Sequence, residues 1–268
     1  MNDSPLALRA HPNTQQFAST TNGMSDCNAI LVGISGVSSS GKTTLARLLR
    51  DIFPNVFILH EDDFYKDDAE IPIKNGVADW DCLEAIDVPA FEKALYYIKK
   101  RGNSPPDLSS KEDKNSVGEV NVNHSVIEDL KWKASKWMFH NVPPIAIIDG
   151  FLLYSEGMTS VRDSFDVKLF LRTDFETAKA RREARSGYVT LQGFWKDPPA
   201  YVENVVWPNY VKDHAYLFTD GDVEGEPATE VVKAFGIETM PRDAQGDMTK
   251  CLVWAFSLLE NALEDFKE

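Results

Sequence analysis

The chain of 268 residues is long enough to bury a substantial hydrophobic core, as one sizeable domain or two small ones. Its 28 Lys and Arg residues against 42 Asp and Glu residues give a net charge of −14, which disfavours nonspecific binding to nucleic acid or to an anionic membrane. The three cysteines lie far apart, the five histidines are scattered, and no apolar run approaches the length that crosses a bilayer. We therefore expect a cytoplasmic protein without a disulfide framework, a zinc site, or a nucleic-acid, membrane or obligate protein partner.

The first 28 residues are predicted to form a disordered tail. They are polar, lack a sustained apolar segment, and carry a single Arg9 together with an early Asp3. This composition fits neither a secretory signal nor a mitochondrial presequence. Met24 is a plausible alternative start, because the first expected strand begins at Ala29. Residues 29–268 are then expected to form a single domain.

Short apolar segments alternate with segments of helical periodicity along the rest of the chain. The expected strands cover 29–35, 56–60, 145–150, 166–172 and 215–220. The expected helices cover 42–53, 88–100, 124–138, 175–187 and 251–263. Two polar segments, 102–123 and 221–247, are interpreted as surface insertions. The alternation predicts an α/β fold, in which helices cover both faces of a mostly parallel sheet.

The segment "GVSSSGKTT" (36–44) has the spacing of a phosphate-binding loop. Gly36 and Gly41 bracket four residues and precede Lys42 and Thr43, and the motif lies between an expected strand and an expected helix. Backbone N–H groups and the helix N-terminus would hold phosphate oxygens. Lys42 would reach the terminal phosphates of a nucleotide, and Thr43 would bind Mg²⁺.

Two other expected strands end in carboxylates, at the edge of the sheet where α/β proteins bind ligands. Asp149 ends the strand at 145–150, and it is expected to hold Mg²⁺ directly or through water. Asp62 and Asp63 follow the strand at 56–60, and either could accept a proton from a substrate hydroxyl or help to bind the metal. The alternatives are a turn-capping role for Asp149 and a solvated acidic loop for the pair.

A basic helix and a segment rich in glycine and proline follow the fourth expected strand. Arg181 and Arg185 share one face of this helix, and Arg182 points about 100° away. Their guanidinium groups could hold triphosphate oxygens and offset charge in a transition state. Residues from about 181 to 200 are expected to form a mobile lid that excludes water. A solvated basic helix face is the alternative.

Trp80 and Asp81 are the residues most informative about the acceptor. They precede an expected helix within "VADWDCLEAID" (77–87). An aromatic face beside a carboxylate could hold a ring and a sugar diol. A core tryptophan beside a helix-capping aspartate agrees equally well with the local sequence.

Six segments, in this order along the chain, resemble the fungal nicotinamide riboside kinases, which are grouped with the uridine kinase-like P-loop kinases. The segments are "GVSSSGKTT", "HEDDFYK", "WDCLEAID", "IIDGFLLY", "RREARSGY" and "FWKDPP". The resemblance extends over about 29–225 and implies a P-loop kinase-type three-layer α/β/α fold with a helical lid. It also implies transfer of the γ-phosphoryl group of ATP to the 5′-hydroxyl of nicotinamide riboside, and of nicotinic acid riboside, for NAD synthesis.

The resemblance assigns roles to individual residues. ATP would be bound by Gly36, Ser38, Ser39, Ser40, Gly41, Lys42, Thr43, Thr44, Arg181 and Arg185. Nicotinamide riboside would be bound by Asp63, Phe64, Tyr65, Trp80, Asp81, Arg182 and Tyr188. The catalytic residues would be Asp63 as the base, Lys42 and Arg182, and the Mg²⁺ ligands would be Thr43, Asp63 and Asp149.

The chemistry of nicotinamide riboside suits these residues, because its pyridinium ring is cationic and tryptophan is the best cation–π partner. A uridine/cytidine kinase is the nearest alternative function. A GTPase switch is disfavoured, since the sequence contains no Asn-Lys-x-Asp segment. A non-catalytic nucleotide sensor is disfavoured, since Lys42, Thr43, Asp63 and Asp149 are all present.

Overall fold

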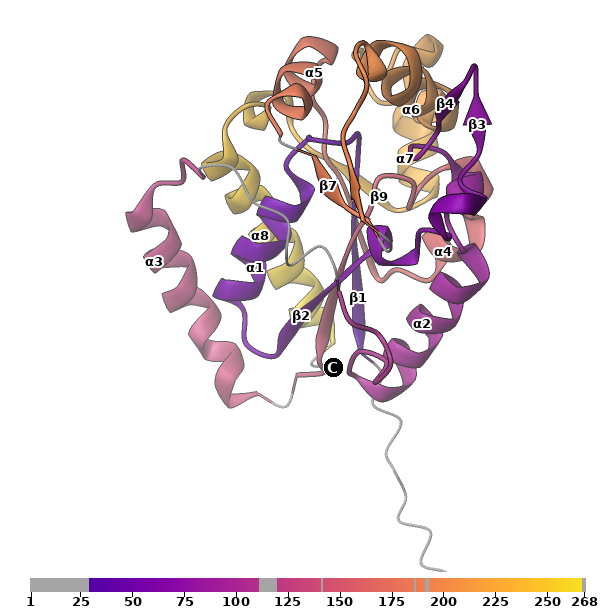
Figure 1. Cartoon of the computed structure of the whole chain (residues 1–268). Coiled ribbons are helices and arrows are strands. Elements are labelled where there is room, and N and C mark those ends of the chain that lie inside the picture. The colour runs from indigo at the N-terminus through magenta and orange to yellow at the C-terminus, as the bar shows by residue number, and fades with distance from the viewer. Residues whose placement is uncertain (1–28, 111–119, 141, 186, 191–192, 267–268) are drawn as a thin grey trace, which may run out of the picture.

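A five-stranded parallel sheet runs through the centre of the protein (Figure 1). The computed structural model describes residues 29–110, 120–140, 142–185, 187–190 and 193–266. The strand order is β2-β5-β1-β6-β9, and each neighbouring pair is parallel. These strands are β1 (Ile30–Ser35), β2 (Val56–His60), β5 (Ile145–Asp149), β6 (Val167–Phe170) and β9 (Ile237–Thr239). Two short hairpins, β3–β4 (Ile73–Lys74 and Val77–Ala78) and β7–β8 (Tyr188–Val189 and Phe194–Trp195), lie outside this sheet.

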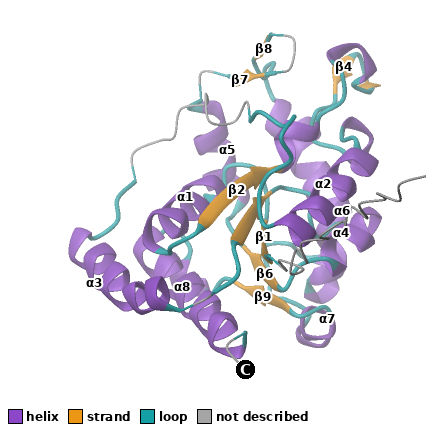
Figure 2. Cartoon of the chain, turned by 90° about the horizontal axis from the view of Figure 1, so that it is seen from below, coloured by secondary structure: helices purple, strands orange, loops and turns teal. Residues whose placement is uncertain are grey.

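Helices cover both faces of the sheet, so the predicted three-layer α/β/α fold is confirmed (Figure 2). One face carries α1 (Lys42–Ile52), α3 (His124–Ala134) and α8 (Met248–Asp265). The other carries α2 (Val88–Arg101), α4 (Thr159–Asp163), α6 (Trp207–His214) and α7 (Thr229–Ala234). The remaining helix, α5 (Phe175–Glu183), lies at the top of Figure 1 together with the β3–β4 hairpin.

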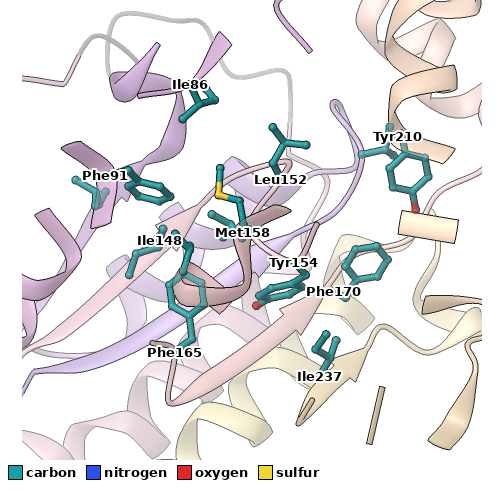
Figure 3. Close-up of a cluster of buried hydrophobic side chains, with 14 of the residues drawn as sticks. Ile86, Phe91, Ile148, Leu152, Tyr154, Met158, Phe165, Phe170, Tyr210 and Ile237 are labelled. Atoms are coloured by element: carbon teal, nitrogen blue, oxygen red, sulfur yellow. The ribbon is translucent and has the colours of Figure 1, made fainter. Parts of the chain in front are cut away.

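The alternation of side chains along the strands explains why there are two hydrophobic cores. In β1, Ile30 and Val32 pack toward α1 and α8, whereas Leu31 packs toward α2. Figure 3 shows the core on the α2 side of the sheet, which includes Phe91, Ile148 and Phe170. Because β1 lies between β5 and β6 and is buried on both faces, its sequence is apolar almost throughout.

The fifth strand of the sheet does not come from the segment that was predicted to form it. Residues 215–220 form 3₁₀ turns, whereas β9 and α7 both come from 221–247, which was interpreted as a surface insertion. Both predictions are therefore wrong. The strand β9 is a short edge strand in which Ile237 is the buried side chain, so its apolar pattern is weak. Leu217 and Phe218 gave an apolar run because they pack into the core from turns.

The remaining predicted elements agree with the structure to within a few residues. The basic helix ends at Glu183, and the helix predicted at 124–138 is α3 followed by a 3₁₀ segment (Ser135–Phe139). In the described parts of 102–123 there is neither helix nor strand. The N-terminal tail lies outside the described residues. None of the described helices combines the length and the apolar character needed to cross a membrane.

Candidate active site

The loop between β1 and α1 has the backbone of a phosphate-binding turn. Gly36 and Gly41 have φ angles of 138° and 103°, which residues with a side chain rarely adopt. A Cβ atom on Gly36 would also collide with the carbonyl oxygen of Leu171. Ser38, Ser39 and Ser40 complete the loop, and Lys42, Thr43 and Thr44 form the first turn of α1. The predicted ATP-binding residues of the loop therefore form one continuous turn at the carboxyl end of β1.

Two buried hydroxyls in this loop fit a bound phosphate. The Oγ atoms of Ser39 and Ser40 are buried and have no hydrogen-bond partner among the described residues. Buried polar atoms in proteins are normally paired, so such atoms indicate a site that a ligand completes. The N-terminus of α1 lies beside them and favours an anion.

Lys42, Thr43 and Asp149 lie together at the start of α1 and the end of β5. Lys42 is buried, and its Nζ donates a hydrogen bond of 3.2 Å to the carbonyl oxygen of Val37. Burial lowers the pKa of Lys42, and the charges of Asp149 and Asp62 oppose that shift. The side chain of Thr43 is hydrogen-bonded to Asp149. Asp149 of β5 is paired in register with Ile34 of β1, so its carboxylate lies near the start of the phosphate loop.

His60, at the end of β2, is a second partner of Asp149. Its Nδ1 lies 3.3 Å from Asp149 Oδ2, and both side chains are buried. Burial alone would raise the pKa of Asp149, but the hydrogen bond from His60 and the charge of Lys42 outweigh it and lower this pKa. Asp149 is therefore held as a carboxylate with His60 and Thr43 as partners.

The oxygen atoms of Thr43 and Asp149 fit a Mg²⁺ ion bound together with a nucleotide. Mg²⁺ is commonly held by one or two carboxylates, water and substrate phosphates rather than by a full set of protein ligands. Among the described residues, no cluster of three or more His, Cys, Asp and Glu side chains could hold a metal. A Mg²⁺ ion at this place would therefore need oxygen atoms from the bound phosphates.

The 3₁₀ turn after β2 (Glu61–Phe64) places two of its residues in structural roles. The buried carboxyl group of Glu61 accepts a hydrogen bond of 3.1 Å from the N–H of Leu152, and burial raises its pKa to about 8. Phe64 packs against Phe91, with ring centroids 4.9 Å apart. Phe64 therefore lies in the core and supports the turn, so the structure does not bring this predicted substrate contact to the site.

Asp62 and Asp63 are distinguished by the groups near them. Burial and the charge of Asp149 raise the pKa of Asp62 to about 6, against the opposing charge of Lys42. The charge of Asp62 acts to raise the pKa of Lys42 at the phosphate loop and the pKa of Tyr65 at the aromatic end of the site. The charge of Asp63 raises the pKa of His60 and of Asp62. Asp62 is therefore within electrostatic reach of Lys42 at the phosphate loop and of Tyr65 at the aromatic end.

Trp80 belongs to an aromatic cluster that comes from three parts of the chain. Its ring centroid lies 5.3 Å from that of Tyr65 and 5.8 Å from that of Trp195. The hydroxyl of Tyr201 accepts a hydrogen bond of 3.0 Å from the Trp80 N–H. Trp80 is 7% exposed, and its Nε1 atom has no hydrogen-bond partner among the described residues. It is therefore a core residue that also borders the site.

Asp81 pairs with Arg182 and does not cap a helix. Arg182 Nη1 and Nη2 donate to Asp81 Oδ1 and Oδ2 at 2.7 and 2.9 Å, which is a bidentate pair. The N-cap of α2 is Asp87, whose side chain accepts a hydrogen bond from the N–H of Ala90. The capping interpretation of Asp81 is therefore wrong.

Arg181 and Arg182 of α5 point in different directions, and Arg185 lies beyond the end of this helix. Arg181 Nη1 donates to the Ser39 carbonyl oxygen at 3.4 Å, and the charge of Arg185 acts on Lys42. Arg182 points away from them and is buried against Asp81. The interpretation of the helix as a solvated basic face is therefore wrong for Arg182. Tyr188 contacts both sides, because the guanidinium groups of Arg182 and Arg185 lie 5.0 and 5.3 Å from its ring.

The described residues of the range 181–200, which is predicted to form a lid, belong to the end of α5, the β7–β8 hairpin and the loop that follows it. Tyr188 is the register partner of Trp195 across this hairpin. Trp195 and Asp197 were not among the predicted site residues, although both lie in "FWKDPP". The aromatic residues of "GFWKDPPAY" are the signal that could have indicated them.

Comparison with known proteins gives one consistent result, although no protein-family model matches the chain. The chain is 42% identical over 236 residues to nicotinamide riboside kinase from Schizosaccharomyces pombe, covering 88% of this chain and 98% of that protein. It is 36% identical over 234 residues to nicotinamide riboside kinase from Saccharomyces cerevisiae, covering 86% and 95%. It is 31% identical over 183 residues to nicotinamide riboside kinase 1 from Homo sapiens, covering 68% and 75%.

Proposed function

The chain belongs to the nicotinamide riboside kinases, and from this we propose that it transfers the γ-phosphoryl group of ATP to the ribose 5′-hydroxyl of nicotinamide riboside. The products are ADP and nicotinamide mononucleotide, a precursor of NAD. One observation supports the proposal most directly: Val37 and Ser38 of the phosphate loop line the same cavity as Asp81, which pairs with Arg182. A phosphate donor and a riboside acceptor can therefore meet at this cavity.

At the donor end, the loop residues and Lys42 bind the phosphates of ATP. Arg181 and Arg185 approach the loop from α5 and add positive charge on the other side of the nucleotide. Thr43 and Asp149 would hold Mg²⁺, which when bound neutralises charge on the phosphate oxygens. Lys42 offsets the charge that develops on the transferred group.

At the acceptor end, Asp62 orients the 5′-hydroxyl and takes its proton. Orientation is the larger contribution, because phosphoryl transfer proceeds through a loose transition state in which the nucleophile needs little activation. Asp63 remains a candidate for the water shell of the metal. We prefer Asp62 as the base because its carboxylate lies in the field of Lys42 and Asp149.

Trp80 and Asp81 bind the nicotinamide riboside itself. The cationic pyridinium ring lies against the aromatic residues around Trp80, where cation–π attraction favours it over a neutral ring. Asp81 and Arg182 bind the ribose hydroxyls. Nicotinic acid riboside carries the same cationic ring, so we include it among the substrates. Uridine and cytidine carry no such charge.

The test is a panel of ribosides incubated with the purified protein, ATP and Mg²⁺. Formation of ADP and of each mononucleotide is measured for nicotinamide riboside, nicotinic acid riboside, uridine and cytidine, with and without EDTA. We expect the two pyridinium ribosides to be phosphorylated, and EDTA to abolish the reaction. Absence of turnover with nicotinamide riboside would falsify the proposal. Faster turnover of uridine or cytidine would support the uridine/cytidine kinase alternative.

A further inference from the structure

Arg182 is enclosed by two carboxylates rather than one. Its Nη1 and Nη2 atoms bind Asp81 at 2.7 and 2.9 Å. Its Nε atom binds Asp197 Oδ2 at 2.7 Å, and Nη2 lies 3.3 Å from Asp197 Oδ1. All three nitrogens of the guanidinium group are therefore engaged by these two aspartates.

The charges of this group do not cancel. Asp81 and Arg182 form a buried ion pair, in which the guanidinium opposes the rise that burial causes in the pKa of Asp81. Asp197 then contributes a second negative charge to the same cation, so the three residues carry one uncompensated negative charge. Of the neighbouring cations, Lys74 is bound to Asp79 at 2.7 Å, and Arg185 donates a hydrogen bond of 3.3 Å to the hydroxyl of Tyr188.

Asp197 also binds one ring of the aromatic cluster around Trp80. Its Oδ1 atom accepts a hydrogen bond of 2.9 Å from the indole Nε1 of Trp195. The Trp195 ring lies 5.8 Å from Trp80 between centroids, at an interplanar angle of 46°. Asp197 thus connects the ring that borders the pocket to the arginine of α5 that pairs with Asp81.

We propose that Asp197 is the residue that makes the acceptor pocket selective for a cationic ring, a role that rests on the proposed function. Its carboxylate supplies the uncompensated negative charge beside Trp80 and Trp195, and its hydrogen bond holds the Trp195 ring in place. A pyridinium ring bound there gains both cation–π and Coulomb attraction, and a neutral ring of the same shape gains neither. Asp81 and Arg182 alone would together be neutral, so the net negative charge of the three residues depends on Asp197.

The experiment compares two acceptors that differ in ring charge. Nicotinamide riboside is cationic, and its 1,4-dihydro form is a neutral riboside of nearly the same shape. The ratio of their kcat/KM values is measured for the wild type, Asp197→Asn and Asp197→Glu. Asp197→Asn keeps an oxygen acceptor for the Trp195 indole but removes the charge, whereas Asp197→Glu keeps the charge. Glu183→Gln, on the exposed side of α5, is the matched control for loss of a carboxylate.

We expect Asp197→Asn to lower kcat/KM for nicotinamide riboside about tenfold, a change equivalent to about 1.4 kcal/mol, and for the dihydro riboside less than about twofold. Asp197→Glu and Glu183→Gln are expected to keep the wild-type ratio to within about twofold. Equal losses for both acceptors in Asp197→Asn, or no loss for either, would overturn the role of the charge.

Two further measurements keep the outcomes separate. Thermal unfolding shows whether each variant is folded, and Asp197→Ser replaces Asp197→Asn if the latter does not fold. If the wild type does not phosphorylate nicotinamide riboside, the proposed function fails and this inference fails with it. If the wild type is active and the ratio is unchanged in a folded Asp197→Asn variant, only the inference about Asp197 is overturned.

Discussion

The phosphate loop comes from one continuous segment, residues 36–44, whereas the acceptor end is assembled from parts of the chain that lie far apart. At the phosphate end, the backbone φ angles of Gly36 and Gly41 shape the loop. At the acceptor end, the central pair joins Asp81 and Arg182, which are 101 residues apart in the sequence. Backbone N–H groups bind any phosphate, but a pocket of distant side chains can be specific for one acceptor. We therefore expect donor-end substitutions to affect all acceptors and acceptor-end substitutions to discriminate among them.

The largest expected effect is at the donor end. Lys42→Ala should lower kcat by about 10³-fold for every riboside that the protein phosphorylates, because Lys42 offsets charge on the transferred group. Arg50→Ala, on the exposed side of the same helix, serves as the control and should be nearly silent. The measurement is kcat for at least two ribosides. A loss of activity confined to one riboside would contradict the expectation that donor-end substitutions affect all acceptors.

Substitution of Asp62, the proposed base, should give the next largest effect. Asp62→Asn is expected to lower kcat by about 10²-fold, because the 5′-hydroxyl loses the group that orients it and takes its proton. Asp63→Asn is expected to lower kcat by less than about tenfold. Kinetics of both variants, with unfolding temperatures as a check on folding, decide between them. The opposite order would restore Asp63 as the base.

The third prediction concerns His214, which lies between the two ends. It borders a small cavity together with Val37 of the phosphate loop and Asp81. Burial lowers the pKa of His214 to about 4, so the unfolded chain binds a proton more readily than the folded protein does. Stability from this group is therefore lost as the pH falls from about 6.5 towards 4. Between pH 7 and pH 5 we expect the free energy of unfolding to fall by about 2 kcal/mol through His214.

Urea unfolding at the two pH values measures this loss. His60 titrates in the opposite direction, since the hydrogen bond and charge of Asp149 outweigh burial and raise its pKa. The wild type is for this reason compared with His214→Gln, which should lack the contribution of His214. An identical pH dependence in the two proteins would contradict the prediction.

The smallest expected effect is the most selective one. Trp80→Leu should raise KM for nicotinamide riboside about tenfold and leave KM for ATP within about twofold, because the cation–π contact belongs to the acceptor alone. Trp132→Leu is a matched control, since Trp132 lies on α3 and is 75% exposed. Equal changes in the two KM values would show that Trp80 supports the fold and does not bind the ring.

Sequence patterns predicted the parts of the molecule in which neighbouring residues determine structure. The central strands and the phosphate loop were predicted because a buried parallel strand has an almost unbroken apolar sequence and the glycines are spaced for the turn. The edge strand β9 was missed because one buried residue leaves little pattern to detect. The resemblance alone assigned Phe64 to the site, and the structure shows its ring packed on Phe91.

By itself, the sequence determined the layer architecture, the phosphate loop and the different directions of Arg181 and Arg182 on one helix. These features depend on short-range geometry, which is periodic along the chain. Only the tertiary structure decided that Arg182 is shared by Asp81 and Asp197, and that the Trp195 ring lies beside the Trp80 ring. Those contacts depend on how the loops after β2 and β5 and the β7–β8 hairpin pack together, which no local spacing encodes.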